Sequence, residues 1–317
     1  WVQASRGSSV VLGTATIVLP YSNVPLTIAF DFGANGNVHL FGHVNLGSSE
    51  ASFMLWPRMP TAGGRDGLFT GTLARNELTN RGPKGEGYVT LSISTTGIVT
   101  ISGCLADGVV YTGTTHIGPG GEVAIYHSSA LADTVAGRVT VASDQSLSGF
   151  LHLKRIPQWF TNSLVHYDGF GPLELNCMGA RYTKPSATEW VLGLADKSLN
   201  ATLELTHPSF LTPAKSLLTL KAGGVSGPTA TMGSTQAVTF TFTPTSGVFY
   251  GTLTTRRPNL NQTSDVALVS IFRGVLVQAA SGQVARGFHL TPDVPAAGNT
   301  AVWMPSTSGL ATISPSL

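Results

Sequence analysis

The chain has 317 residues, of which 42% are hydrophobic and 11% are charged, with a formal net charge of +2. This composition excludes a disordered chain, which would be poor in apolar residues and rich in charge, and the scattered 18 basic and 16 acidic residues argue against an electrostatic nucleic-acid-binding surface. No apolar run reaches the roughly 18 residues of a transmembrane helix, and the length predicts two domains.

The first half of the chain has the pattern of a series of short strands. Apolar residues alternate there with Thr, Ser and Gly at the period of two that an extended strand imposes. Asn35-Gly36 lies between two such runs, and Asn-Gly is the strongest short-range signal of a β-hairpin. We predict strands at 9–19, 25–32, 38–46, 50–56, 87–94, 98–105, 109–115 and 123–127.

The second half continues the pattern. The sole helical candidate is 209–218, and Pro213 within it argues against a helix because proline breaks the helical hydrogen-bond ladder. We predict strands here at 189–194, 201–205, 216–220, 237–243, 247–254 and 266–276.

A glycine set inside alternating apolar positions recurs along the chain. Glycine in a strand marks a bend, a bulge or a close approach of two backbones. Many such strands in series predict a curled antiparallel sheet, and therefore a barrel or a sandwich. The glycines are Gly42, Gly71, Gly103, Gly137, Gly149, Gly251, Gly274 and Gly287.

One segment of each half is nearly the same as a segment of the other. Gly-Leu-Phe-Thr-Gly-Thr-Leu at 67–73 matches Gly-Val-Phe-Tyr-Gly-Thr-Leu at 247–253. We predict an all-β fold of two tandem antiparallel β-barrel or sandwich-like domains related by internal duplication. The Pro and Gly residues near 157–172 indicate a linker, so the predicted domains are 1–155 and 173–317, with a linker at 156–172.

Three segments resemble a known group of proteins. They are the hairpin pattern and Gly-Pro-Gly-Gly turn within 85–131, Gly-Ala-Arg-Tyr-Thr-Lys-Pro at 179–185, and the 247–253 segment. They resemble a β-rich domain of large exported proteins of Verrucomicrobia and Planctomycetes, often found beside immunoglobulin-like repeats. The resemblance implies an exported, extracellular or cell-surface location, and it brings no activity for particular residues.

The chain has two cysteines, Cys104 and Cys177, one in each half. Their strand-like contexts fit either a disulfide or two buried free thiols. In the resembling group polar residues would be expected at these positions, and this favours a disulfide between them.

No catalytic motif is present. The chain lacks Gly-x-Ser-x-Gly. His39 and His43 share one face of a strand but lie roughly 13 Å apart, too far for one metal ion. His166, Asp168 and Glu174 are a weak cluster beside Tyr167 in the predicted linker. The other histidines are isolated: His116, His127, His152, His207 and His289.

A glycosidase would need two carboxylates close in space. The candidates are few, and Asp107 is better explained as the turn residue of Ala-Asp-Gly. We therefore predict no catalytic residue, cofactor or metal ligand. The candidates are Asp31, Glu50, Asp107, Glu122, Glu174 and Glu189.

Aromatic side chains offer a second type of site. An aromatic ring can stack on the face of a sugar, although most such residues fill cores. The residues considered for glycan stacking are Trp56, Trp159, Trp190 and Trp303, with Tyr21 and Tyr126 also available.

Both ends of the chain contain uncharged, strand-like segments, at 8–19 and within 301–317. A strand of this type either completes its own sheet or adds to the edge of another, and contacts that do not close on themselves make filaments. We therefore expect a non-enzymatic surface module that assembles through terminal strands or edges with its own copies or with other surface proteins. A carbohydrate-binding module is the alternative, and a glycan-active enzyme is third.

Overall fold

The structure is a computed structural model of the chain. It describes the backbone of the strands before residue 56, and both backbone and side chains for most of the later residues. The described residues are 10–19, 22–32, 38–46, 49–56, 59–76, 82–128, 134–155, 169–206, 212–224, 237–257, 266–280, 282–292 and 306–316.

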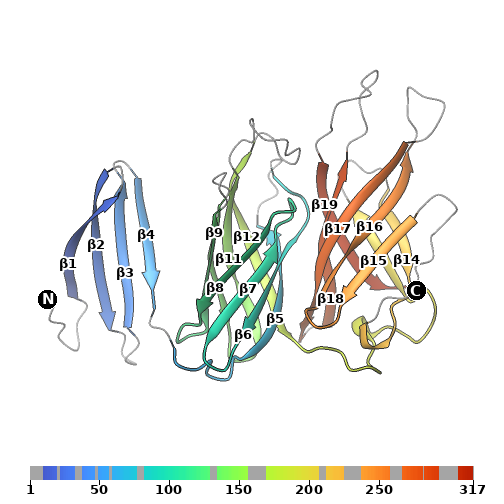
Figure 1. Ribbon diagram of the computed structural model, residues 1–317, viewed down its shortest axis with the longest axis horizontal. Helices are drawn as coiled ribbons and strands as arrows, with labels where there is room; N and C mark the ends of the chain where they lie inside the picture. The colour runs from blue at the N-terminus through green and yellow to red at the C-terminus, as the bar shows by residue number, and fades with distance from the viewer. Residues whose placement is uncertain are drawn as a thin grey trace, which may run out of the picture.

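The described residues form nineteen strands and two short 3-10 helices, with no α-helix among them. The predicted all-β class is confirmed. The strands make three antiparallel sheets that follow one another along the chain (Figure 1).

The N-terminal sheet is a four-stranded meander. Its strands pair in chain order, and the antiparallel pairing of the second and third confirms the hairpin predicted around Asn35-Gly36. The strands are β1 (Val10–Leu19), β2 (Ser22–Phe32), β3 (Val38–Leu46) and β4 (Ser49–Leu55).

The middle sheet has eight strands in the order β8-β7-β6-β5-β12-β11-β10-β9. Two four-stranded meanders are joined where the last strand returns to pair with the first, so the sheet curls into a nearly closed barrel around Phe69, Tyr111 and Leu151. The strands are β5 (Gly67–Arg75), β6 (Gly87–Ile93), β7 (Ile98–Cys104), β8 (Val110–His116), β9 (Glu122–Ser128), β10 (Thr134–Val141), β11 (Ser146–Arg155) and β12 (Phe170–Tyr182).

The C-terminal sheet has seven strands in the order β14-β13-β19-β18-β17-β16-β15. Its last strand also pairs with its first, and it curls around stacked phenylalanines, with the rings of Phe240 and Phe249 centred 6.2 Å apart. The strands are β13 (Ala201–Thr206), β14 (Ala214–Leu218), β15 (Ala237–Thr243), β16 (Val248–Arg257), β17 (Val266–Ala279), β18 (Gly282–Pro292) and β19 (Ser306–Pro315).

Glycines inside the strands permit this curling. A Cβ atom at Gly103 would overlap the buried ring of Tyr111, and one at Gly287 would overlap the carbonyl oxygen of Arg273. These positions admit no side chain because a ring or a neighbouring backbone occupies the space. The recurring glycines therefore correctly predicted close approaches within the sheets.

The middle and C-terminal sheets pack directly against each other. Tyr88 and Cys104 of the middle sheet are buried in one cluster with Val275 and Phe288 of the C-terminal sheet. The buried Thr70 hydroxyl donates to the carbonyl oxygen of Leu276 at 2.7 Å. The two sheets therefore share a small apolar core of their own between the two larger ones.

The sheets divide the chain at positions other than the predicted domain boundaries. The predicted linker 156–172 ends inside β12, which pairs with both β11 and β5 and so belongs to the middle sheet. Gly171 and Pro172, which indicated a linker, stand opposite a register shift between Leu153 and Arg155. Proline is tolerated in a strand at such an irregularity. The chain passes to the C-terminal sheet only after Tyr182, and residues 10–55 form a separate sheet.

One predicted strand is wrong. Within 189–194 the chain forms the 3-10 helix η1 (Val191–Gly193), with Leu192 at a φ of 58°. The apolar residues Val191 and Leu194 are still buried against the C-terminal core. Their backbone reaches that core in a helical turn and not in an extended strand. A second 3-10 helix, η2, spans Ala222–Gly224.

The two echoing segments occupy different places in their sheets. The segment at 67–73 lies in β5, the first strand of the middle sheet, whereas 247–253 leads into β16, the fourth strand of the C-terminal sheet. Both begin at a glycine with positive φ, and both carry a fully buried phenylalanine, Phe69 and Phe249. The echo therefore predicted the same local strand structure twice, and duplication of the domains stays a prediction.

Candidate functional site

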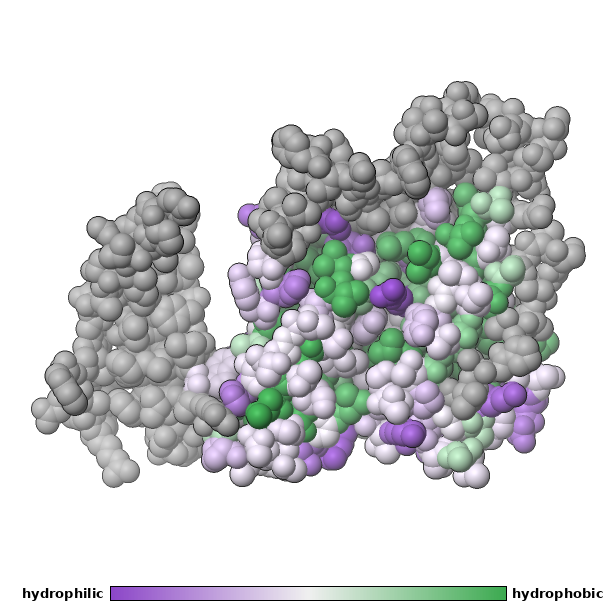
Figure 2. All heavy atoms as spheres, viewed as in Figure 1, coloured by the Kyte–Doolittle hydropathy of each residue, from purple (hydrophilic) through white to green (hydrophobic). Residues whose placement is uncertain are grey.

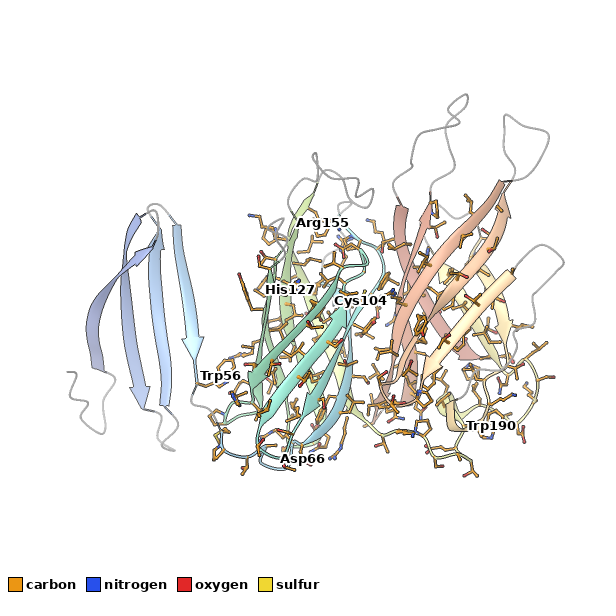
Figure 3. The ribbon with its side chains drawn as sticks, in the orientation of Figure 1. Trp56, Asp66, Cys104, His127, Arg155 and Trp190 are labelled. Carbon is orange, nitrogen blue, oxygen red and sulfur yellow. The ribbon has the colours of Figure 1, made fainter. Side chains whose placement is uncertain are left out.

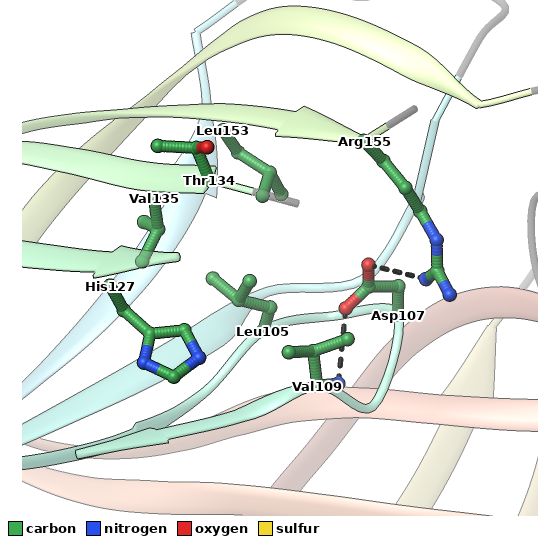
Figure 4. A pocket seen from close by; sticks show the side chains of 8 residues that line it. All are labelled: Leu105, Asp107, Val109, His127, Thr134, Val135, Leu153 and Arg155. Atoms are coloured by element: carbon green, nitrogen blue, oxygen red, sulfur yellow. Dashed lines mark hydrogen bonds and ion pairs between the residues drawn. The ribbon is translucent and has the colours of Figure 1, made fainter. Parts of the chain in front are cut away.

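Charged and polar groups gather inside the middle sheet at one end of the barrel (Figure 4). The guanidinium of Arg155, at the end of β11, donates to Asp107 Oδ2 at 2.8 Å, and both side chains are buried. Asp107 Oδ1 accepts from the backbone N–H of Val109 at 3.1 Å. Asp107 is thus the predicted turn residue. It also forms an ion pair with Arg155, which no local sequence pattern indicates.

A small cavity adjoins this ion pair. Its volume of about 10 Å³ holds about one water molecule, which is far too small for a sugar or an organic cofactor. His127 of β9 borders it, with its ring centred 6.4 Å from that of Tyr111. The arrangement pairs two buried charges and offers no room for a substrate. The lining residues are Leu105, Asp107, Val109, His127, Thr134, Val135, Leu153 and Arg155.

Other candidate groups are not brought together. Over the part of the chain that the structure describes, no three His, Cys, Asp or Glu residues are placed to hold a metal ion. Glu174, in β12, accepts from the Asn76 amide at 2.7 Å and pairs across strands with His152. His166 and Asp168 lie outside the described residues, as does His207.

The two cysteines are not joined, contrary to the pairing that the resemblance favoured. Both are buried free thiols. Cys104 lies in the cluster between the two sheets, whereas Cys177 lies in the interior of the middle sheet. Burial raises the pKa of each thiol to about 12, so both are protonated at neutral pH.

The predicted tryptophan sites do not form one platform. Trp56 is half-buried, and its indole lies against Gly118 beside the Glu122 carboxylate. Trp190 is half-buried against the C-terminal core, far from Trp56 (Figure 3). Trp159 and Trp303 lie outside the described residues.

Exposed apolar side chains instead gather on the outer face of β9–β12. Tyr126, Phe150 and Met178 are 70%, 53% and 69% exposed. The register pairs Tyr126 with Ala136, Phe150 with Arg138, and Met178 with Ser148. The three residues lie on β9, β11 and β12, and each belongs to the next row of cross-strand partners along the sheet. They therefore form a diagonal line on its outer face, which we call the outer stripe.

Polar groups border the outer stripe on one side. Asn176 donates to Asn76 Oδ1 at 3.1 Å, and Asn76 in turn donates to Glu174. Arg138 lies in the same row as Phe150. Tyr, Phe, Met and Arg are the residue types enriched in protein interfaces, with a polar rim around them.

The exposed apolar residues elsewhere have a different character. On the visible face of the middle and C-terminal sheets, hydrophobic residues lie interspersed with polar ones (Figure 2). Elsewhere on these two sheets Val110, Val269 and Ile271 are 46–52% exposed, and Thr254 and Thr252 stand opposite the last two. Val269 and Ile271 lie on one face of β17 with Tyr250 of β16 beside them, but at 45–48% these side chains are less exposed than those of the outer stripe, which is therefore the stronger candidate.

Of the three residues of the outer stripe, Tyr126 is available from its residue type alone, whereas Phe150 and Met178 were not predicted to be exposed. Both lie in alternating runs where neighbouring residues on either side are apolar, and alternation alone does not tell which face is outside.

Comparison of the chain with protein-family models, with curated proteins and with solved structures gives no match. No helix within the described ranges is long and apolar enough to cross a membrane.

Proposed function

We propose that this chain is a non-enzymatic structural module of the cell surface or extracellular space, which contacts copies of itself or other surface proteins through the faces of its sheets. The observation that carries the proposal is the outer stripe, where three large apolar side chains lie exposed in adjoining rows of a rigid sheet. Burying them against a partner removes apolar surface from water, which is the main driving force of association.

Two further observations support a role without chemistry. The buried charges of Arg155 and Asp107 pair with each other beside a cavity the size of one water molecule. The thiols are buried and protonated, so neither is a nucleophile at neutral pH. The low charge and the resemblance to exported β-rich proteins support the proposed location.

The proposed mode of assembly differs from the terminal-strand contacts that the sequence alone favours. The C-terminal strand β19 pairs with β13 on one side and β18 on the other, so it has no free edge. β1 does lie at the edge of its sheet. Sheet faces, rather than the C-terminal strand, are therefore the contact surfaces we propose.

The test compares the full chain with a variant in which Tyr126, Phe150 and Met178 are all changed to Ser. Light scattering after size-exclusion chromatography and negative-stain electron microscopy are followed over a concentration series. We expect particles of the wild type that grow with concentration, and smaller particles for the variant. A control carrying Val110→Ser and Ile271→Ser should assemble as the wild type does. Equal assembly of all three proteins contradicts the proposal.

Carbohydrate binding is the second candidate, and Trp56 is the residue that favours it. Its ring lies beside the Glu122 carboxylate, which also accepts from the Gly120 N–H at 2.8 Å. An aromatic face next to a carboxylate is a common way of holding a sugar. Quenching of tryptophan fluorescence by a glycan, lost in Trp56→Ala and kept in Trp190→Ala, would favour this function over protein contact.

A further inference from the structure

The N-terminal sheet has one face without a single charged residue. In β2 every second residue is apolar, including Leu26, Ile28 and Phe30. The register places Ile17 of β1, Val44 of β3 and Phe53 of β4 on the same face. Because residues alternate between the faces of a strand, these apolar positions share one face of the sheet.

The opposite face of this sheet has the ordinary character of a surface. The two charged residues of its strands, Asp31 and Glu50, fall there by the same register, together with His39 and His43. A sheet with one apolar and one polar face packs its apolar face on something. The pattern therefore specifies which face requires a partner.

No other described element packs along this sheet. Its strands pair only with one another, and in Figure 1 it stands apart from the middle sheet. Four strands of this length are too few to close around a core of their own, whereas the eight and seven strands of the other two sheets do so.

The middle sheet shows how this type of chain solves the same problem. The segment Gly-Arg-Val-Thr-Val at 137–141 resembles Gly-His-Val-Asn-Leu at 42–46. Val139 and Val141 of that segment are fully buried, because β5–β8 cover the inner face of β9–β12. Val44 and Leu46 have the same spacing on the apolar face of the N-terminal sheet, which lacks four covering strands within the described chain.

We propose that the apolar face of β1–β4 packs against the same face of a second copy of this chain, so that two four-stranded sheets form an eight-stranded sandwich. The middle and C-terminal sheets already enclose their own apolar faces. Among the sheets that the structure describes, the uncovered inner face on a second copy is therefore this same face, and a contact between like faces is closed by two-fold symmetry.

The size of the face suits a stable dimer. Four strands about 4.8 Å apart and roughly 30 Å long cover about 600 Å². Two such faces together bury about 1,200 Å², which reaches the lower end of specific interfaces. The absence of charge is typical of interfaces that stay together permanently.

This inference uses a different surface from the outer stripe, so the two can fail separately. We would measure the mass of the full chain by light scattering at low concentration, for the wild type and for Leu26→Asp. Leu26 lies centrally on the apolar face, between Ala15 and Val44. The matched control is Thr27→Asp, one residue along and on the opposite face.

We expect twice the chain mass of 33.0 kDa for the wild type and for Thr27→Asp, and the single mass for Leu26→Asp. The triple Ser variant of the outer stripe should remain a dimer. A monomeric wild type, or a dimer that Leu26→Asp leaves intact, overturns the inference.

Because Leu26→Asp could lose the dimer by misfolding, a second measurement tests the interface without this variant. A spin label on Thr27→Cys lies on the outer side of each sheet, and stacked sheets are about 10 Å apart. We expect a distance of roughly 20–30 Å between the two labels of a dimer, allowing for the length of both labels. A dimer whose labels are much farther apart joins through another surface, which also overturns the inference.

Discussion

The interior of the middle sheet contains an ion pair, whereas the interior of the C-terminal sheet contains a chain of neutral hydrogen-bonding groups. In the middle sheet Arg155 and Asp107 neutralise each other at 2.8 Å. In the C-terminal sheet the fully buried His289 ring contacts the Thr206 carbonyl at 3.1 Å and the Thr291 hydroxyl at 2.8 Å, and Thr291 contacts Ser270 at 2.7 Å.

The neutral chain has a definite direction. A carbonyl oxygen only accepts, so Nε2 of His289 donates to Thr206, and in the neutral tautomer that carries its proton on Nε2 the Nδ1 atom accepts from Thr291. The Thr291 oxygen is then available to the Ser270 hydroxyl. The loss of stability on removing one partner therefore differs between the two interiors. A charge left unpaired in the middle sheet is costly, whereas each neutral hydrogen bond contributes about 1 kcal/mol.

The largest expected effect comes from breaking the ion pair. Arg155→Met leaves the Asp107 carboxylate buried without its cation, which should destabilise the middle sheet by about 3–5 kcal/mol. Denaturant unfolding read out by hydrogen exchange in β7–β11 measures the loss. Adding Asp107→Asn to Arg155→Met should recover most of it, since the buried charge is then gone. Equal losses in the single and double variants would show that charge is not the cause.

The second effect tests the neutral chain. His289→Phe keeps the ring volume but removes both hydrogen bonds, and should cost about 1–3 kcal/mol in the C-terminal sheet. Hydrogen exchange in β18 and β19 locates the change. His152→Phe, on the exposed face of β11, is the control and should cost little. A larger loss for His289→Phe than for Arg155→Met would reverse the comparison.

The third effect is smaller still. Ser270→Ala removes only the last hydroxyl of the chain, with an expected cost of about 0.5–1.5 kcal/mol. Since Ser270 acts through Thr291, combining it with His289→Phe should cost less than the sum of the two. Ser148→Ala on the exposed face of β11 is the matched control. Strict additivity would mean that the groups do not act as one chain.

The last prediction has no effect at neutral pH and concerns the thiols. Burial raises the pKa of Cys104 and Cys177 from 9.0 to about 12, so the folded state holds protons that the unfolded state releases. Their contribution to stability is therefore complete below about pH 9 and is lost as the pH rises towards 12. Alkaline unfolding followed by circular dichroism, with Cys177→Ala for comparison, measures this.

The same thiols give a simple count. A thiol reagent at pH 8 should find none in the native protein and two per chain in denaturant without reductant. Cys104→Ala and Cys177→Ala should each lower the count by one. A count of zero in denaturant would restore the disulfide expected from the resemblance.

Much of the strand pattern was predictable because it depends on neighbours in sequence. Strands such as Val38–Leu46 and Ala237–Thr243 occur at the predicted ranges, and Asp107 is the predicted turn residue. The boundary near 156–172 was misplaced because Gly171 and Pro172 also fit opposite a register shift in β12. The strand at 189–194 failed because buried apolar residues are compatible with a turn as well as with a strand.

The candidate site was less predictable than the fold. Tyr126 could be named from its type, but the outer stripe exists only because β9, β11 and β12 place it beside Phe150 and Met178. The ion pair joins residues 48 positions apart, and nothing local to Arg155 indicates its partner.

By itself the sequence determined that the chain is all-β, antiparallel and curled, since alternation, turn residues and strand glycines act over a few residues. Tertiary structure alone decided how the strands divide among three sheets, which apolar residues face out, and which charges meet. These depend on strand order and register, which are set by the free energy of packing distant segments together. That is why the two cysteines, both in strands, lie in separate cores.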